Sequence, residues 1–128
     1  MQRGITASMI FHVVALDNWL AVPDQPYAPE TFVEEGFIHC SPDEPVTLAV
    51  ASAFYRDTPD PLMVLLIDED KLDVMVRWEA ASPVPPPGVA PGTLFPHVYG
   101  SISRDAVEDV KEVQRDADRR AVGLTMWP

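Results

Sequence analysis

The segment Leu62–Ile67 is an unbroken apolar run with the length of a β-strand. A strand that is apolar at every position must be covered on both faces, whereas a half-exposed strand alternates apolar and polar residues. The run therefore predicts a central strand of a sheet. A chain of 128 residues is long enough to bury such a strand within one domain.

Short segments typical of strands and helices surround this run. Strand patterns occupy residues 9–14, 37–40, 74–79 and 94–100, and Pro96 marks the last of these as an edge strand or a bulge. Helical patterns cover residues 15–22 and 30–35, and Gly36 is placed to end the second. Residues 80–93 hold five prolines and two glycines, which is typical of an exposed loop. Strands and helices alternate early and strands dominate later, so we expect an α+β domain with a mixed sheet.

The strongest local signal is the start of a longer helix that runs to about Tyr55. Ser41 can cap this helix, Pro42 suits its first position, and Glu44 completes a capping box. We therefore expect Ser41 to be the N-cap.

The charge of the chain restricts its partners. Twenty acidic residues against nine Lys and Arg give a net charge of −11. Phosphate backbones and anionic lipid repel such a chain unless a basic patch compensates. The basic residues Arg115, Arg119 and Arg120 are interleaved with Asp116 and Asp118. Nucleic acid and membranes are therefore not expected partners.

Other sequence features favour a cytoplasmic protein. No stretch of about 18 apolar residues could span a membrane, and residues 1–8 lack the pattern of a secretory signal. Cys40 is the only cysteine, which excludes an internal disulfide and is typical of a reducing compartment.

The three histidines of the chain, His12, His39 and His97, each lie in the middle of a strand-like segment. Side chains alternate across a strand, so three imidazoles could converge on one cleft. Two other interpretations stay open: hydrogen-bonded core histidines, and a three-histidine zinc site of a metal hydrolase.

The trio Arg77-Trp78-Glu79 could bind an anion, stack against a ring and orient a hydroxyl group. The alternative is a surface ion pair beside a core tryptophan.

Four motifs together resemble the signatures of the bacterial family called domain of unknown function 952. They are Ile10–Val13 (Ile-Phe-His-Val), Glu34–Ser41 (Glu-Glu-Gly-Phe-Ile-His-Cys-Ser), Arg77–Glu79, and Leu94–Gly100 (Leu-Phe-Pro-His-Val-Tyr-Gly). The resemblance extends over residues 9–118. We therefore expect one domain over residues 1–128, with flexible or docked tails at residues 1–8 and 119–128.

This resemblance implies a small α+β fold grouped with the ADP-ribosyltransferases. In that superfold a curved, split sheet with short flanking helices holds nicotinamide adenine dinucleotide (NAD) in a cleft. By position, His12 matches the residue that holds the adenosine-side ribose, and His39 and Ser41 lie in the motif that supports the nicotinamide side. His97 falls where the superfold commonly has a glutamate that orients the acceptor. The resemblance also implies a short helix at residues 105–107 before a final strand through residues 110–113.

We therefore expect an ADP-ribosyltransferase-like domain that uses NAD as a substrate, with no other cofactor assigned. The residues expected to be catalytic are His39 and His97, and those expected to bind NAD are His12, Ser41, Arg77, Trp78 and Tyr99. The imidazole in place of a glutamate leaves a second interpretation open, a small-molecule-binding module that keeps the cleft without turnover.

Overall fold

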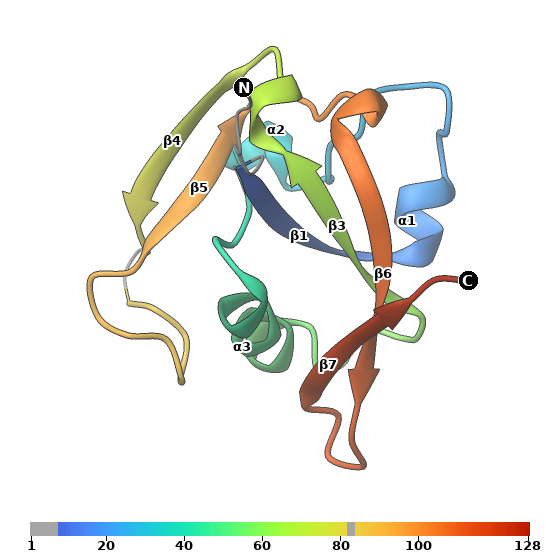
Figure 1. The fold of residues 1–128 in the computed structure, drawn as a ribbon, viewed down its shortest axis with the longest axis vertical. Coiled ribbons are helices and arrows are strands. Elements are labelled where there is room, and N and C mark those ends of the chain that lie inside the picture. Colours follow the sequence, from blue (N-terminus) through green and yellow to red (C-terminus); the bar gives the residue numbers. More distant parts are fainter. Residues whose placement is uncertain (1–7, 82–83) are drawn as a thin grey trace, which may run out of the picture.

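The computed structural model describes residues 8–81 and 84–128, and it is an α+β fold of two antiparallel sheets and a few short helices (Figure 1). The first sheet has the order β1-β3-β6-β7, with strands β1 (Met9–Ala15), β3 (Leu62–Asp68), β6 (Val107–Arg115) and β7 (Ala121–Met126). The second has the order β2-β5-β4, with strands β2 (Ile38–His39), β5 (Leu94–Tyr99) and β4 (Met75–Ala80).

The helices are α1 (Leu16–Leu20), α2 (Phe32–Glu35) and α3 (Glu44–Phe54), with 3₁₀ turns η1 (Glu69–Lys71) and η2 (Arg104–Ala106). Helix α3 packs against β1 and β7, and Figure 1 shows β4 and β5 splayed away from the first sheet. Within the described ranges, none of these helices has the length and apolar character needed to cross a lipid bilayer.

Strand β3 is the central strand that the apolar run predicts. It pairs with β1 on one side and with β6 on the other. Met63 and Leu65 pack into one core cluster, whereas Leu62 and Val64 pack into a second cluster that includes Ala51 of α3. All four β3 side chains are fully buried, so both faces of the strand are covered as expected.

A short backbone bridge joins the two sheets. The Phe11 N–H donates to the Ser41 carbonyl at 2.9 Å, and the Ser41 N–H donates to the Phe11 carbonyl at 2.7 Å. The bridge ties β1 to the residues that follow β2. It therefore places His12 of the first sheet beside His39 of the second.

The strand pairing differs from the expected mixed sheet. Among the described residues, every pair of named strands is antiparallel. β5, expected to be an edge strand or to have a bulge at Pro96, lies in the middle of its sheet. The Pro96 carbonyl accepts from the Cys40 N–H at 3.1 Å, and the N and C=O of one residue point to the same neighbour in an antiparallel ladder. Pro96 has no backbone N–H, and its nitrogen lies on the side of β5 that faces the end of β2. Strand pairing between β2 and β5 stops there, so no hydrogen bond is lost.

The N-cap of α3 is Asp43, and the expectation of Ser41 was wrong. The Asp43 carboxylate accepts from the Val46 N–H at 3.0 Å. Ser41 is buried in the bridge to Phe11, two residues before the cap. Gly36 ends α2 as expected, because its φ of 81° is the left-handed conformation that glycine adopts without strain.

The C-terminal part of the chain adds strands to the first sheet. η2 leads directly into β6, as the family resemblance implies. Residues 121–126, expected in a tail, form β7 and pair with β6. The first seven residues, most of the expected N-terminal tail, lie outside the described part of the chain.

Candidate functional site

His12 is a buried histidine with one unpartnered nitrogen. Its side chain leaves β1 toward β2, and Nδ1 lies 2.7 Å from the backbone carbonyl oxygen of His39. A carbonyl can only accept a hydrogen bond, so Nδ1 carries the proton and Nε2 presents a lone pair. Nε2 is buried and has no hydrogen-bond partner among the described residues. Burial lowers the pKa of His12 to about 4, which keeps the ring neutral near pH 7.

A cavity of about 510 Å³ opens beside this histidine. His12, Tyr27, His39 and Arg104 contribute to its lining. The Tyr27 ring lies 5.6 Å from that of His12, and burial raises the pKa of the Tyr27 hydroxyl, which therefore stays protonated. The cavity thus combines a bare imidazole acceptor with a protonated phenol.

His97 forms an imidazole–carboxylate pair with Glu79. His97 Nδ1 lies 2.7 Å from Glu79 Oε1, and the Tyr99 hydroxyl donates to the same oxygen at 2.5 Å. The hydrogen bonds from Tyr99 and His97 lower the pKa of Glu79, so this carboxylate is ionised and accepts both. Because Nδ1 donates to Glu79, the Nε2 atom of a neutral His97 is free to accept a proton.

Phe37 fixes the position of His97 relative to His39. The Phe37 ring stacks on the His97 ring at 4.3 Å, and the rings of His39 and His97 lie 5.5 Å apart. His39 and His97 are also directly opposite in the β2–β5 register, which puts them on one face of the sheet. His39 is the more exposed of the two, and its Nε2 lies 3.1 Å from Glu35 Oε2.

A second cavity of about 520 Å³ lies over this face. Its lining includes Ser41, His97 and the aromatic rings of Phe37 and Phe95. The residues that line both cavities are Val13, Thr31, His39 and Tyr55. The two cavities therefore adjoin at His39 and form one cleft, which we call the histidine cleft.

The histidine cleft contains four of the seven residues that the sequence analysis selected. His12 lines the first cavity, Ser41 and His97 line the second, and His39 lines both. The three histidines thus converge. Among the described residues, no group of three or more His, Cys, Asp or Glu side chains is arranged to hold a metal ion.

The other three selected residues lie outside the lining of the histidine cleft. Arg77 pairs with His97 in the β4–β5 register, but its Nε donates to Met75 Sδ at 3.0 Å. Trp78 points to the opposite face of the sheet, where its Nε1 donates to Glu69 at 3.1 Å. Tyr99 contacts Glu79 and Phe37 from the far side of His97.

Glu79 and Glu35 were not among the expected site residues, although the Arg77-Trp78-Glu79 trio pointed to Glu79 as a group that could orient a hydroxyl. Glu79 shares a face with Arg77, two residues away, which is a signal that strand alternation provides. Its contact with His97 depends on the β4–β5 register, which a single sequence does not reveal. Glu35 lies four residues before His39, but its contact with His39 crosses the turn at Gly36 and has no pattern of its own.

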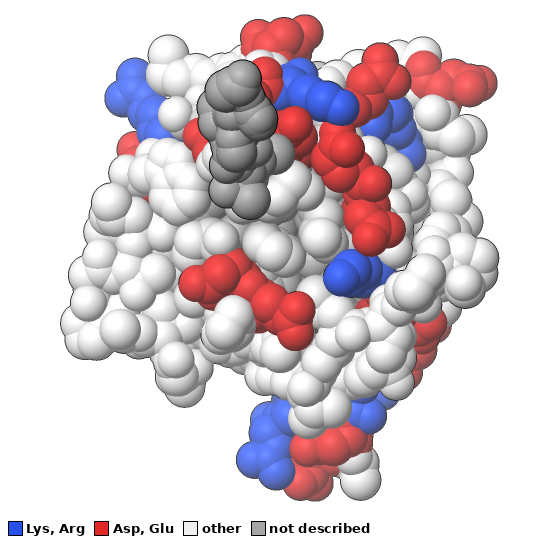
Figure 2. Space-filling view, in the orientation of Figure 1, with Lys and Arg blue, Asp and Glu red and all other residues white. Residues whose placement is uncertain are grey.

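Few cations are available to the cleft. Among the described lining residues of the two cavities, Arg104 is the sole Lys or Arg. The face shown in Figure 2 has acidic and basic side chains interspersed along its upper edge and a largely uncharged lower left part over the β4–β5 hairpin and its loop. This face shows no basic patch.

The comparisons assign the family. A sequence model of the family described as "Protein of unknown function (DUF952)" matches residues 13–110. The chain belongs to this family. No curated protein matches the sequence.

Solved structures of a protein from Caulobacter crescentus, CC0527, have a similar fold. Its crystal structure has 20% sequence identity and a TM-score of 0.63, and the match covers 89% of this chain and 93% of that one. Its solution NMR structure has 23% identity and a TM-score of 0.62, with coverage of 88% and 90%. At this identity the likeness shows the fold that this DUF952 chain shares with CC0527.

Proposed function

We propose that this DUF952 protein binds a ribose-bearing small molecule in the histidine cleft, and that NAD is the first compound to test. One observation carries the proposal: His12, whose buried Nε2 atom has no hydrogen-bond partner among the described residues, lines a cavity that adjoins, at His39, the cavity lined by His97. A buried acceptor needs a donor, and a ribose hydroxyl supplies one. The split sheet and the resemblance to ADP-ribosyltransferases support the same ligand.

The His97–Glu79 pair supports an enzymatic role. In the proposed reaction, water or an acceptor hydroxyl attacks the anomeric carbon of the ribose. The new C–O bond forms as the C–N bond to nicotinamide breaks, and the bonding electrons leave with the nicotinamide nitrogen. His97 Nε2 takes the proton of the attacking hydroxyl, and Glu79 holds the imidazole in the required tautomer and stabilises its cationic form.

The family resemblance implies a glutamate at the position of His97, and in this proposal Glu79 supplies the carboxylate. The sequence puts imidazole there, and Glu79 of β4 lies directly behind it at 2.7 Å. His97 therefore acts as the base, and Glu79 acts through His97.

A binding module without turnover is the second candidate. Glu79 does not line either cavity, and its Oε1 already accepts from His97 and Tyr99. In this candidate the two hydrogen bonds serve only to hold β4 and β5 together.

The test is calorimetric titration of NAD into the wild type, His12→Asn and Trp78→Phe. Asparagine keeps a donor near the position of Nδ1 and removes Nε2, so binding should be lost. Trp78 lies on the opposite face of the sheet and serves as the control, which should bind as the wild type does. NAD at 100 times its dissociation constant should stabilise the wild type by about 2.7 kcal/mol. Absence of binding at millimolar NAD would rule out NAD as the ligand.

Release of nicotinamide separates the two candidates. The enzymatic proposal expects His97→Gln to lower kcat by about 10²- to 10⁴-fold with NAD affinity unchanged. Binding without any release of nicotinamide by the wild type favours the binding module.

A further inference from the structure

The charges around the histidine cleft restrict which ligand it accepts. The acidic side chains in its lining are Glu30 in the first cavity and Glu35 in the second. Arg104 is their sole cationic counterpart in the described lining. A phosphate group in the cleft would need a partner of opposite charge or a set of free donors.

Each guanidinium nitrogen of Arg104 already donates to the backbone. Its three guanidinium nitrogens donate to the backbone carbonyls of Trp19, Val22 and Gln25, each at 2.8 Å. The guanidinium carbon also lies 4.0 Å from the centre of the Trp19 ring. Arg104 thus holds the segment after α1 in place, and three of its five N–H groups are committed to these contacts.

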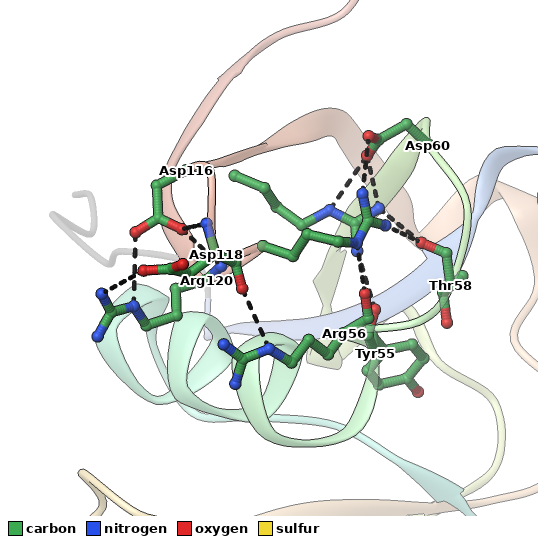
Figure 3. Close-up of polar contacts among 9 residues, drawn as sticks. Tyr55, Arg56, Thr58, Asp60, Asp116, Asp118 and Arg120 are labelled. Carbon is green, nitrogen blue, oxygen red and sulfur yellow. Dashed lines mark hydrogen bonds and ion pairs between the residues drawn. The ribbon is translucent and has the colours of Figure 1, made fainter.

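The next arginines along the cleft wall are also engaged. Tyr55 and Thr58 line the first cavity, and Figure 3 shows their backbone oxygens within a network that includes Asp60. Arg115 donates to the Tyr55 carbonyl at 2.9 Å and to Asp60 Oδ1 at 2.5 Å. Arg119 donates to the Thr58 carbonyl at 2.7 Å. These guanidinium groups tie the β6–β7 loop to the segment after α3.

The histidines of the cleft do not replace the missing cations. His12 is neutral, and its unpartnered Nε2 atom is a buried acceptor that carries no positive charge. A phosphate monoester near pH 7 has mostly acceptor oxygens, which cannot donate a hydrogen bond to His12 Nε2. A ribose hydroxyl or a ring N–H donates to Nε2 instead.

We infer that the histidine cleft recognises its ligand as a riboside and gives phosphate groups no partner, so that a nucleoside binds more tightly than its own 5′-phosphate. The inference rests on the proposed function and specifies the substrate class. Neutral and cationic ribosides fit the negative lining, and the aromatic rings of Phe37, Tyr55 and Phe95 offer apolar walls for a base.

Arg77 is the residue that could reverse this preference. It lies beside His97 on the same sheet face, outside the lining of either cavity, and is exposed. Its guanidinium carbon lies 5.7 Å from the centre of the Tyr99 ring. The inference expects Arg77→Ala to leave the affinity for every ligand unchanged.

The experiment compares nicotinamide riboside with nicotinamide mononucleotide, which differs only by its 5′-phosphate, and with NAD. Calorimetry measures the dissociation constants for the wild type, Glu35→Gln, Arg77→Ala and His12→Asn at low and high salt. We expect the riboside to bind at least about threefold more tightly than the mononucleotide at low salt, because like charges repel. Salt and Glu35→Gln should each reduce this ratio, since both weaken the repulsion.

The outcomes separate the inference from the proposed function. A ratio below about threefold, or tighter binding of the mononucleotide, overturns the inference and leaves ribose binding intact. If the wild type binds the mononucleotide more tightly and Arg77→Ala removes that gain, Arg77 binds the phosphate group. If none of the three ligands binds the wild type, the proposed function fails and the inference fails with it.

Discussion

The Nδ1 atom of His12 lies 2.7 Å from the backbone carbonyl oxygen of His39, so a side chain of one sheet is bonded to the main chain of the other. This contact determines the tautomer of His12, which leaves Nε2 as the unprotonated nitrogen of a residue that lines the first cavity. It depends on the adjacent Phe11–Ser41 bridge, which brings β1 and β2 together. The junction between the sheets therefore creates the polar feature of the histidine cleft.

The buried His12 should make the protein less stable in mild acid. Its pKa is about 4 in the folded state, whereas an exposed histidine has a pKa of 6.5. Below pH 6.5 the unfolded chain binds a proton that the folded chain does not, so this contribution to stability is present above that pH and is lost as the pH falls toward 4. Between about pH 8 and about pH 5 the free energy of unfolding should fall by about 2 kcal/mol from this residue. Urea denaturation at both pH values measures it.

The control for this effect is His12→Asn, which cannot titrate in that range. Its loss of stability between the two pH values should be smaller than that of the wild type by the contribution of His12. Equal losses in both proteins would show that the ring is not buried as a neutral base.

Replacement of Glu79 should change the titration of Tyr99. The hydrogen bond to the Glu79 carboxylate raises the pKa of Tyr99. In Glu79→Gln the acceptor is uncharged, so the pKa of Tyr99 should fall toward its ordinary value. Ultraviolet difference titration of the tyrosinate band detects the shift, and Tyr99→Phe assigns it. Glu108→Gln, which removes a carboxylate bonded to Lys71, is the matched control and should leave the Tyr99 titration unchanged.

Local patterns were sufficient where a segment's role depends on its own residues. The apolar run at Leu62–Ile67 identified the central strand, and Gly36 identified the end of α2. The three histidines lie in strands as the local patterns predict, although His12 belongs to a different sheet from His39 and His97. Each of these inferences needs only side-chain periodicity or the backbone freedom of one residue.

The predictions failed where the position of a residue depends on contacts with segments that are distant in the sequence. Ser41 has the chemistry of a cap, but the bridge to Phe11 takes it into the sheet junction. Pro96 is tolerated in a central strand because β2 ends beside it. Glu79 reaches His97 only through the β4–β5 register. None of these relationships is encoded within a short stretch of sequence.

The cap of α3 can be tested directly. Asp43→Ala removes the acceptor for the Val46 N–H and should lower the free energy of unfolding by about 1 kcal/mol. Asp43→Asn keeps an acceptor oxygen and should retain most of that stability. Urea denaturation of the two variants measures the difference. Equal stability of Asp43→Ala and the wild type would show that the helix gains nothing from this cap.

Gly100 keeps the end of β5 close to Val74. A Cβ at this position would lie 2.5 Å from Val74 Cγ1 and 2.7 Å from Val74 Cβ, so Gly100→Ala should destabilise the protein by about 1–3 kcal/mol. Gly123→Ala on β7 is the control, since a Cβ there meets no atom within 4 Å. Adding Val74→Ala to Gly100→Ala removes Cγ1 and should restore part of the lost stability. Because Gly100 directly follows the strand that holds His97, Gly100→Ala should also weaken the His97–Glu79 pair. A fall in the pKa of Tyr99 alongside the lost stability would detect that displacement, whereas an unchanged Tyr99 titration would confine the strain to Val74.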